Sequence, residues 1–66
     1  MQITLNGTPR ELASATTVAE LLTELGIRPQ QVAVEVNREL VPRSRHSLHL
    51  LQAEDWVEIV TLVGGG

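Results

Sequence analysis

Residues 17–26 read TVAELLTELG, and this stretch predicts a short amphipathic helix. Thr17 and Glu20 form a capping box, because the threonine hydroxyl can accept from the Glu20 amide while the glutamate side chain reaches back. Gly26 stands where a left-handed C-terminal cap belongs, and Pro29 opposes continuation of the helix. The helix is therefore expected over residues 18–25. Its apolar residues share one face at helical spacing: Val18, Leu21, Leu22 and Leu25.

The segment before this helix predicts a β-hairpin. Residues 2–6 alternate polar and apolar side chains, as a half-buried strand does. Asn6-Gly7 follows, and this dipeptide favours a tight hairpin turn because both residues tolerate positive φ. The returning strand is expected over residues 8–13, with Leu12 pointing inward. Pro9 has no N–H to donate to a ladder, so this strand is expected at an edge of the sheet.

Two more strands are expected directly after the helix. Residues 32–36 alternate, with three valines on the buried face. Asn37-Arg38 is expected to form a tight turn into a short strand over residues 39–41, which Pro42 ends.

Residues 43–53 show a mixed pattern with no clear period. Leu48 and Leu51 are expected to hold this segment against the core. His46 and His49 stand three residues apart, a spacing that fits a metal ion if the segment is helical. Since no cysteine or paired carboxylate completes such a site, we interpret both as surface histidines and expect no metal centre.

A last strand, rich in β-branched residues, is expected over residues 56–63. Alternation places Val57 and Ile59 on its buried face and Val60 and Leu62 on the opposite, helix-free face. Apolar side chains on that face gain little from folding. Val60 and Leu62 are therefore the candidate partner-binding residues.

The order hairpin, helix, strand, short strand and last strand predicts the architecture. A single amphipathic helix needs one sheet to cover it, and a right-handed crossover carries the chain over that helix. The fold class expected is α+β, a β-grasp (ubiquitin-like) mixed sheet packed on one main helix, with the first and last strands adjacent and parallel. Residues 1–63 would form this domain, and residues 64–66 a flexible glycine tail.

Length and composition restrict the possible functions. The chain of 66 residues has room for one core and no deep internal pocket. It has no cysteine, and its net charge of −3 disfavours nucleic acid or an anionic membrane as a partner. It shows no signal peptide and no apolar run of membrane-spanning length, so a cytoplasmic location is expected. Three arginines lie close in sequence and are interpreted as a solvated face: Arg38, Arg43 and Arg45.

Three glycines close the sequence, and folding does not explain them. Glycine loses much backbone entropy on ordering and adds no side chain to a core, so a frayed end is the simplest interpretation of Gly64, Gly65 and Gly66. Their position directly after a strong core strand points instead to chemistry. A terminal carboxylate is an anion and a poor electrophile at neutral pH, but adenylation by ATP gives it a good leaving group. Chain without Cβ atoms can pass a narrow channel to reach the nucleotide.

Three segments of the sequence resemble the ThiS family, the sulfur carriers of the thiamine pathway. They are QITLNG at residues 2–7, VEVNRELVPR at residues 34–43 and EDWVEIVTLVGG at residues 54–65. The resemblance covers essentially the whole chain. The family usually has Gly-Asp before its last strand, where this chain has Glu54-Asp55, and it typically ends on two glycines rather than three.

This resemblance implies a sulfur carrier for the thiazole ring of thiamine, not an enzyme. An adenylating enzyme related to ubiquitin activators would use ATP and Mg²⁺ on the Gly66 carboxylate. Sulfur from a donor such as a cysteine desulfurase would then give a thiocarboxylate, and a thiazole synthase would take that sulfur. The carrier would bind no cofactor of its own and contribute no catalytic side chain.

Other functions remain open at this point. The small subunit of molybdopterin synthase shares the fold and the glycine tail, although that family tends to carry prolines just before the tail. A protein modifier would end as an amide on a target lysine, and a non-covalent β-grasp binding module would carry an inert tail. Trp56 belongs to the core by composition but faces outward by alternation, where it would indicate an interface.

Overall fold

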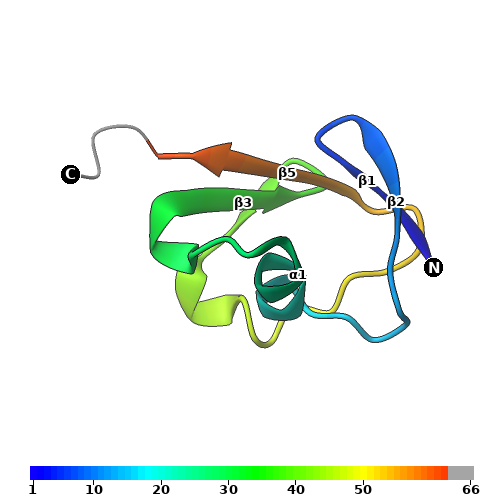
Figure 1. Cartoon of the computed structure of the whole chain (residues 1–66), viewed down its shortest axis with the longest axis horizontal. Helices are drawn as coiled ribbons and strands as arrows, with labels where there is room; N and C mark the ends of the chain where they lie inside the picture. The colour runs from blue at the N-terminus through cyan, green and yellow to red at the C-terminus, as the bar shows by residue number, and fades with distance from the viewer. Residues whose placement is uncertain (63–66) are drawn as a thin grey trace.

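The structure is a computed structural model that describes residues 1–62. The predicted end of the last strand at Val63 and the glycine tail at 64–66 lie outside these residues. Figure 1 shows the chain in space. Its strands are β1 (Gln2–Leu5), β2 (Thr8–Glu11), β3 (Val32–Val36), β4 (Glu39–Val41) and β5 (Trp56–Thr61), and its helices are α1 (Val18–Leu25) and the 3₁₀ turns η1 (Pro29–Gln31) and η2 (Arg43–Arg45).

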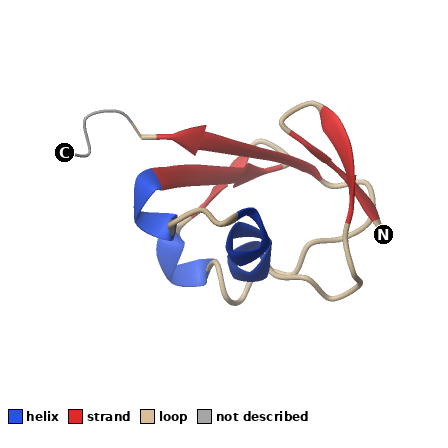
Figure 2. Cartoon of the chain, in the orientation of Figure 1, coloured by secondary structure: helices blue, strands red, loops and turns tan. Residues whose placement is uncertain are grey.

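The strands form one mixed sheet in the order β2-β1-β5-β3-β4. β1 and β5 pair in parallel, and the other three neighbouring pairs are antiparallel. Helix α1 and both 3₁₀ turns lie on one side of this sheet (Figure 2). The predicted β-grasp architecture is confirmed, including the parallel contact of the first and last strands. β2 occupies an edge, as Pro9 predicted.

Local signals fix both ends of α1, which spans the predicted residues. The Glu20 amide donates to Thr17 Oγ1 at 3.1 Å, and the Thr17 amide donates to Glu20 Oε1 at 2.8 Å. Gly26 ends the helix in the left-handed region with φ of 70°. The amides of Gly26 and Ile27 both donate to carbonyls of the last turn, which satisfies groups that a helix end leaves open.

The loop that contains the two histidines completes the N-terminal cap of α1. The amide of Val18 donates to the His49 carbonyl at 3.0 Å, and the amide of Ala19 donates to the His46 carbonyl at 2.9 Å. These are two of the four amides that the first turn of a helix leaves without an internal partner. The loop thus lies against α1 through its backbone.

The prediction that both histidines lie on the surface is wrong for His46, because its ring is buried. The residue is 4% exposed, and its Nε2 lies 3.1 Å from the Val41 carbonyl oxygen. Its Nδ1 is also buried, with no hydrogen-bond partner among residues 1–62. His49 is half-buried.

The prediction that Leu48 packs against the core is also wrong, because its side chain is 67% exposed. The chain makes a tight turn here, with the amides of Leu48 and His49 both donating to the Arg45 carbonyl at 3.0 Å. Residues two apart in such a turn point to nearly opposite sides. Since His46 points inward, Leu48 points outward, and Leu51 alone of the two leucines enters the core as predicted.

The core lies between α1 and the face of the sheet that it covers. Val32, Val34 and Val36 of β3 are all buried, as their alternation predicted. Val57 of β5 is fully buried, and Ile59 is partly buried against the same cluster. The remaining members are Ile3, Leu12, Val18, Leu21, Leu22, Val41 and Leu51.

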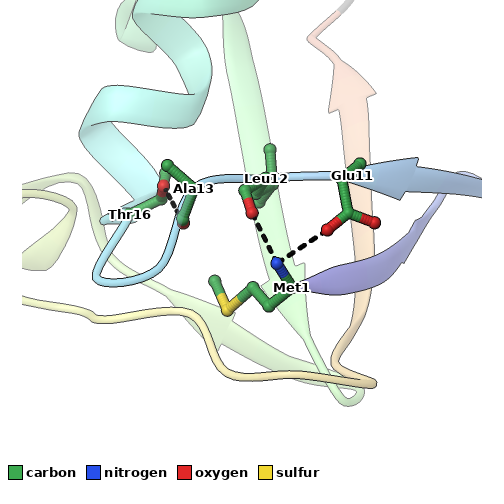
Figure 3. Close-up of polar contacts among 5 residues, drawn as sticks. All are labelled: Met1, Glu11, Leu12, Ala13 and Thr16. Atoms are coloured by element: carbon green, nitrogen blue, oxygen red, sulfur yellow. Dashed lines mark hydrogen bonds and ion pairs between the residues drawn. The ribbon is translucent and has the colours of Figure 1, made fainter.

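The first residue of the chain ties β1 to the segment after β2 (Figure 3). The Met1 ammonium nitrogen lies 2.8 Å from Glu11 Oε2 and 2.7 Å from the Leu12 carbonyl oxygen. The Leu12 amide donates back to the Met1 carbonyl at 2.8 Å, and the Thr16 hydroxyl donates to the Ala13 carbonyl at 2.6 Å. β2 thus ends at Glu11, before the predicted residue 13, while Leu12 is buried as predicted.

Candidate functional site

The candidate site lies on and around β5, the strand that leads to the glycines. Val60 lies on the outer face of the sheet, away from α1, because its neighbours Val57 and Ile59 face the core. Leu62 is 50% exposed and follows the end of β5, beside Pro29 and Gln30 of η1. The predicted outward direction of Val60 is thus confirmed, and that of Leu62 stays a prediction. Their binding role stays a prediction. Gly64, Gly65 and Gly66 lie outside the described residues.

Four large apolar side chains stand exposed on and beside this outer face, and we call them the outer patch. They are Leu40 at 63% exposure, Trp56 at 48%, Val60 at 54% and Leu62 at 50%. Trp56 therefore faces outward, with its Nε1 3.3 Å from Glu58 Oε1. Large apolar side chains that folding leaves exposed on one face are candidates for an interaction site.

Sequence reasoning missed Leu40, although a signal was present. Leu40 alternates with the buried Val41 on β4, and its register partner on β3 is Glu35. Glu35 in turn lies opposite Glu58 on β5. Two carboxylates thus lie on the same face as the apolar residues, so a partner with cationic groups beside an apolar surface would complement it.

Two asparagine side chains hold β5 in place. Asn37 Oδ1 accepts from the Trp56 amide at 2.9 Å, and Asn37 Nδ2 donates to Asp55 Oδ1 at 3.0 Å. On the other side of the strand, Asn6 Oδ1 accepts from the Ile59 amide at 2.8 Å, and Asn6 Nδ2 donates to the Ile59 carbonyl at 3.3 Å. The turns of both hairpins therefore reach β5 through side chains as well as through the ladder.

Leu62, the last residue that the structure describes, is held by a hydrogen bond to η1. The Leu62 amide donates to the Gln31 carbonyl at 2.8 Å, which continues the antiparallel pairing with β3 into η1. The exit of the chain towards the glycines is thus fixed relative to the sheet.

A groove of about 400 Å³ opens on the helix side of the sheet, between the end of β1 and the continuing β5. Asn6, Gln31 and Thr61 contribute polar groups to its wall. Its apolar lining consists of Leu5, Leu25, Ile27, Val32 and Ile59.

No constellation for side-chain catalysis is found among residues 1–62. No three His, Asp or Glu side chains gather there to hold a metal ion. The arginines at 38, 43 and 45 are exposed, and the ion pairs found in this part of the chain are those of Met1 with Glu11 and of Arg10 with Glu24. No helix among these residues is both long and apolar enough to cross a membrane.

Comparison with known proteins gives one consistent match. The sequence model of the ThiS family matches residues 3–66. A thiazole synthase from Magnetococcus marinus is 42% identical over 66 residues, which are the whole of this chain and 20% of that protein. The sulfur carrier protein ThiS of Escherichia coli is 33% identical over the full length of both chains. A crystal structure of the thiamine biosynthesis protein ThiS from Geobacter metallireducens superposes with a TM-score of 0.87 at 33% identity and covers all of both chains.

These relatives differ in length. The chain spans about a fifth of the length of the thiazole synthases that it matches and the full length of the Escherichia coli carrier.

Proposed function

The chain belongs to the ThiS family, and on that premise we propose that it is a sulfur carrier of thiamine biosynthesis whose reactive group is the Gly66 carboxylate. The observation that carries this proposal is the family match over residues 3–66, which includes the glycines after β5. The same match favours this function over that of a molybdopterin synthase subunit. The chain serves as a substrate and co-substrate, and the catalysis belongs to its partners.

The proposed chemistry replaces one carboxylate oxygen by sulfur. A Gly66 carboxylate oxygen attacks the α-phosphorus of ATP, which the adenylating enzyme holds with Mg²⁺, and pyrophosphate leaves. The terminal sulfur of a persulfide on a donor such as a cysteine desulfurase attacks the carbonyl carbon, and AMP leaves to give an acyl disulfide. A second thiol then attacks the donor sulfur of this S–S bond, forms a disulfide with the donor and releases the thiocarboxylate. The thiocarboxylate that results is a sulfur nucleophile for the thiazole synthase.

The three glycines suit these steps. A tail without Cβ atoms lets the backbone of a partner approach closely on all sides. An activated carbonyl on glycine also has no stereocentre beside it to lose. These properties explain why glycines, rather than other small residues, follow β5.

A thiazole synthase is the partner that the comparisons support best. In two thiazole synthases, a segment 42% and 41% identical to this chain forms part of the same polypeptide. Such a segment would deliver its sulfur to the enzyme that it is joined to. For this chain we propose that the outer patch, with Val60 and Leu62 nearest the glycines, docks the adenylating enzyme.

Intact mass spectrometry of the protein isolated from its own cells tests the proposal. We expect a population heavier by the difference between sulfur and oxygen, with the added mass located on Gly66 by fragmentation. Protein made in cells that lack the adenylating enzyme is the control and should show the carboxylate alone. A protein that carries no sulfur in thiamine-starved cells, or that carries it elsewhere, would contradict the proposal.

A further inference from the structure

The two edges of β5 differ in how far along the strand they are paired. On one side β3 pairs with it from Val57 to Thr61, and the Leu62 amide extends this pairing to Gln31. On the other side β1 pairs with Trp56 and Val57 only. Figure 1 shows β5 continuing past the β1–β2 hairpin with β3 on one side of it. This second edge is open towards the end of the strand.

Asn6 marks the point where the open edge begins. Backbone groups of alternate residues point to opposite edges of a strand. The Val57 carbonyl accepts from the Asn6 amide at 2.9 Å, so the N–H and C=O of Val57, Ile59 and Thr61 face away from β3. The Asn6 side chain satisfies both groups of Ile59. For the next such residue, Thr61, no hydrogen-bond partner of either backbone group is found among residues 1–62.

The groove on the helix side lies beside this open edge. Leu5 and Asn6, at the end of β1, line it together with Ile59 and Thr61 of β5. It therefore occupies the place where a strand in line with β1 would put its inward side chains. Its volume of about 400 Å³ has room for a large apolar side chain.

We propose that an extended segment of the thiazole synthase pairs with the open edge of β5 at Thr61 and places an apolar side chain in this groove. An extended backbone can form hydrogen bonds with both backbone groups of Thr61. Since alternate side chains of such a segment point to the same face, one of them can enter the apolar groove. The identity of the partner rests on the proposed function.

The length of chain after Thr61 supports a partner that acts on Gly66. Gly66 is five positions after Thr61, and even a fully extended chain covers at most about 18 Å over that distance. An enzyme that takes sulfur from Gly66 therefore has its active site within that reach of Thr61. A segment paired with Thr61 would fix the start of the tail while the enzyme works on its end.

Thr61→Pro is the variant that tests this pairing. Proline removes the N–H that faces the open edge and leaves the bonds to β3 intact, so the fold should tolerate it as edge strands do. Thr61→Ala is the matched control, since it removes the side chain and keeps the N–H. We expect Thr61→Pro to weaken binding to the cognate thiazole synthase about tenfold or more and Thr61→Ala to change it less than threefold.

Amide hydrogen exchange of the unsubstituted protein gives a second measurement. The Thr61 amide should exchange at least tenfold more slowly in the complex with the synthase than in the free protein. The Val60 amide, which faces β3 in both, should change little. Equal synthase binding by Thr61→Pro and the parent, or a Thr61 amide that stays unprotected in the complex, would overturn the proposal. Protection of Thr61 in the free protein that rises with its concentration would also overturn it, because a second copy would then take the edge.

These outcomes separate the pairing from the proposed function. If the thiocarboxylate forms on Gly66 but Thr61 shows no role in synthase binding, the pairing is wrong and the sulfur carrier stands. If no thiocarboxylate forms under any condition, the carrier function fails, whatever Thr61 binds.

Discussion

At the scale of the residue, two hairpin turns adopt the same backbone shape with different amino acids. Asn6 and Gly7 have φ values of 48° and 82°, and Asn37 and Arg38 have φ values of 53° and 69°. Both pairs show the left-handed conformation that two-residue hairpin turns need. Asparagine tolerates it and also bonds to β5 in both turns, whereas Arg38 adopts it at a cost that glycine avoids.

Substitutions at the second position of each turn should therefore have opposite effects. Gly7→Ala should lower the free energy of unfolding by about 1 kcal/mol, and Arg38→Gly should raise it by about 0.5–1 kcal/mol. A Cβ added at Gly7 meets nothing within 4 Å, so its effect comes from the backbone alone. Urea unfolding of both variants measures the two changes. Effects of the same sign would show that the turns do not limit stability in this way.

His46 shows what residue types alone do not reveal. Histidine is more often exposed than buried, and a spacing of three residues gives no sign of which member points inward. Its burial depends on Val41 and on how the turn from Arg45 to His49 lies against α1, and the spacing of the histidines does not specify these contacts. For the same reason Leu48 was expected in the core and lies outside it.

Removal of the buried His46 ring should lower the free energy of unfolding more than removal of the half-buried His49 ring. His46→Ala leaves a cavity and removes the contact of the ring with the Val41 carbonyl, which keeps its place opposite Val34 in the sheet, so we expect a loss of about 1–3 kcal/mol in the free energy of unfolding. His49→Ala, at a half-buried position, should lose less than about 1 kcal/mol. The backbone carbonyls of both residues still cap α1, so the comparison isolates the side chains. Equal losses in thermal unfolding would contradict the assignment of His46 to the core.

At the scale of the element, the sequence patterns predicted the features that depend on interactions between residues close in sequence. The capping box and Gly26 gave both ends of α1, and Asn6-Gly7 gave the first hairpin, because each signal lies within a few residues of the structure it specifies. Alternation likewise predicted the outward direction of Val60. The open edge at Thr61 could not be predicted in this way, since it depends on where β1 ends beside β5, and these strands are far apart in the sequence.

The outer face of β5 is the element on which the docking proposal depends. Val60→Asp and Leu62→Asp should each weaken binding to the adenylating enzyme at least tenfold, which is about 1.4 kcal/mol, because a carboxylate would enter an apolar contact. Both side chains are about half exposed, so the folded state should persist with a loss of about 1 kcal/mol or less.

Leu48→Asp is the control for these variants, because Leu48 is an exposed leucine outside the outer patch. It should bind the enzyme like the parent protein in a titration. Unfolding of Val60→Asp or Leu62→Asp at room temperature would show that these residues stabilise the core. Unchanged enzyme binding by both variants would remove the outer patch from the interface.

At the scale of the whole molecule, the features that folding leaves unused gather around β5. The core takes the helix side of the sheet, while Trp56 and Val60, the open edge at Thr61 and the groove all lie on or beside this one strand. Three glycines follow it in the sequence. A domain this small buries only about 60% of the surface of its unfolded chain, so exposed apolar side chains are common. Two of them, Val60 and Leu62, lie shortly before the glycines, and this position favours a functional cause.

Deletion of the last glycines should abolish the chemistry without changing the stability of the domain. Deletion of Gly65 and Gly66 moves the terminal carboxylate back by two residues, or about 7 Å of extended chain. Misplacement of a reacting group by about 1 Å can already cost a hundredfold in rate. The shortened protein should therefore form no acyl-adenylate. Its free energy of unfolding should stay within about 0.5 kcal/mol of the parent value, because glycines add no side chain to the core.

ATP–pyrophosphate exchange with the cognate adenylating enzyme measures this loss directly. The single deletion of Gly66 is the informative comparison, since it leaves a Gly-Gly end of the kind that the ThiS family typically carries and should keep part of the exchange. Urea unfolding of all three proteins shows whether the domain itself is unchanged. Exchange by the double deletion at the rate of the parent would mean that the enzyme does not act on the Gly66 carboxylate. The proposed sulfur chemistry would then have no starting point in this chain, whatever its outer patch or the open edge of β5 binds.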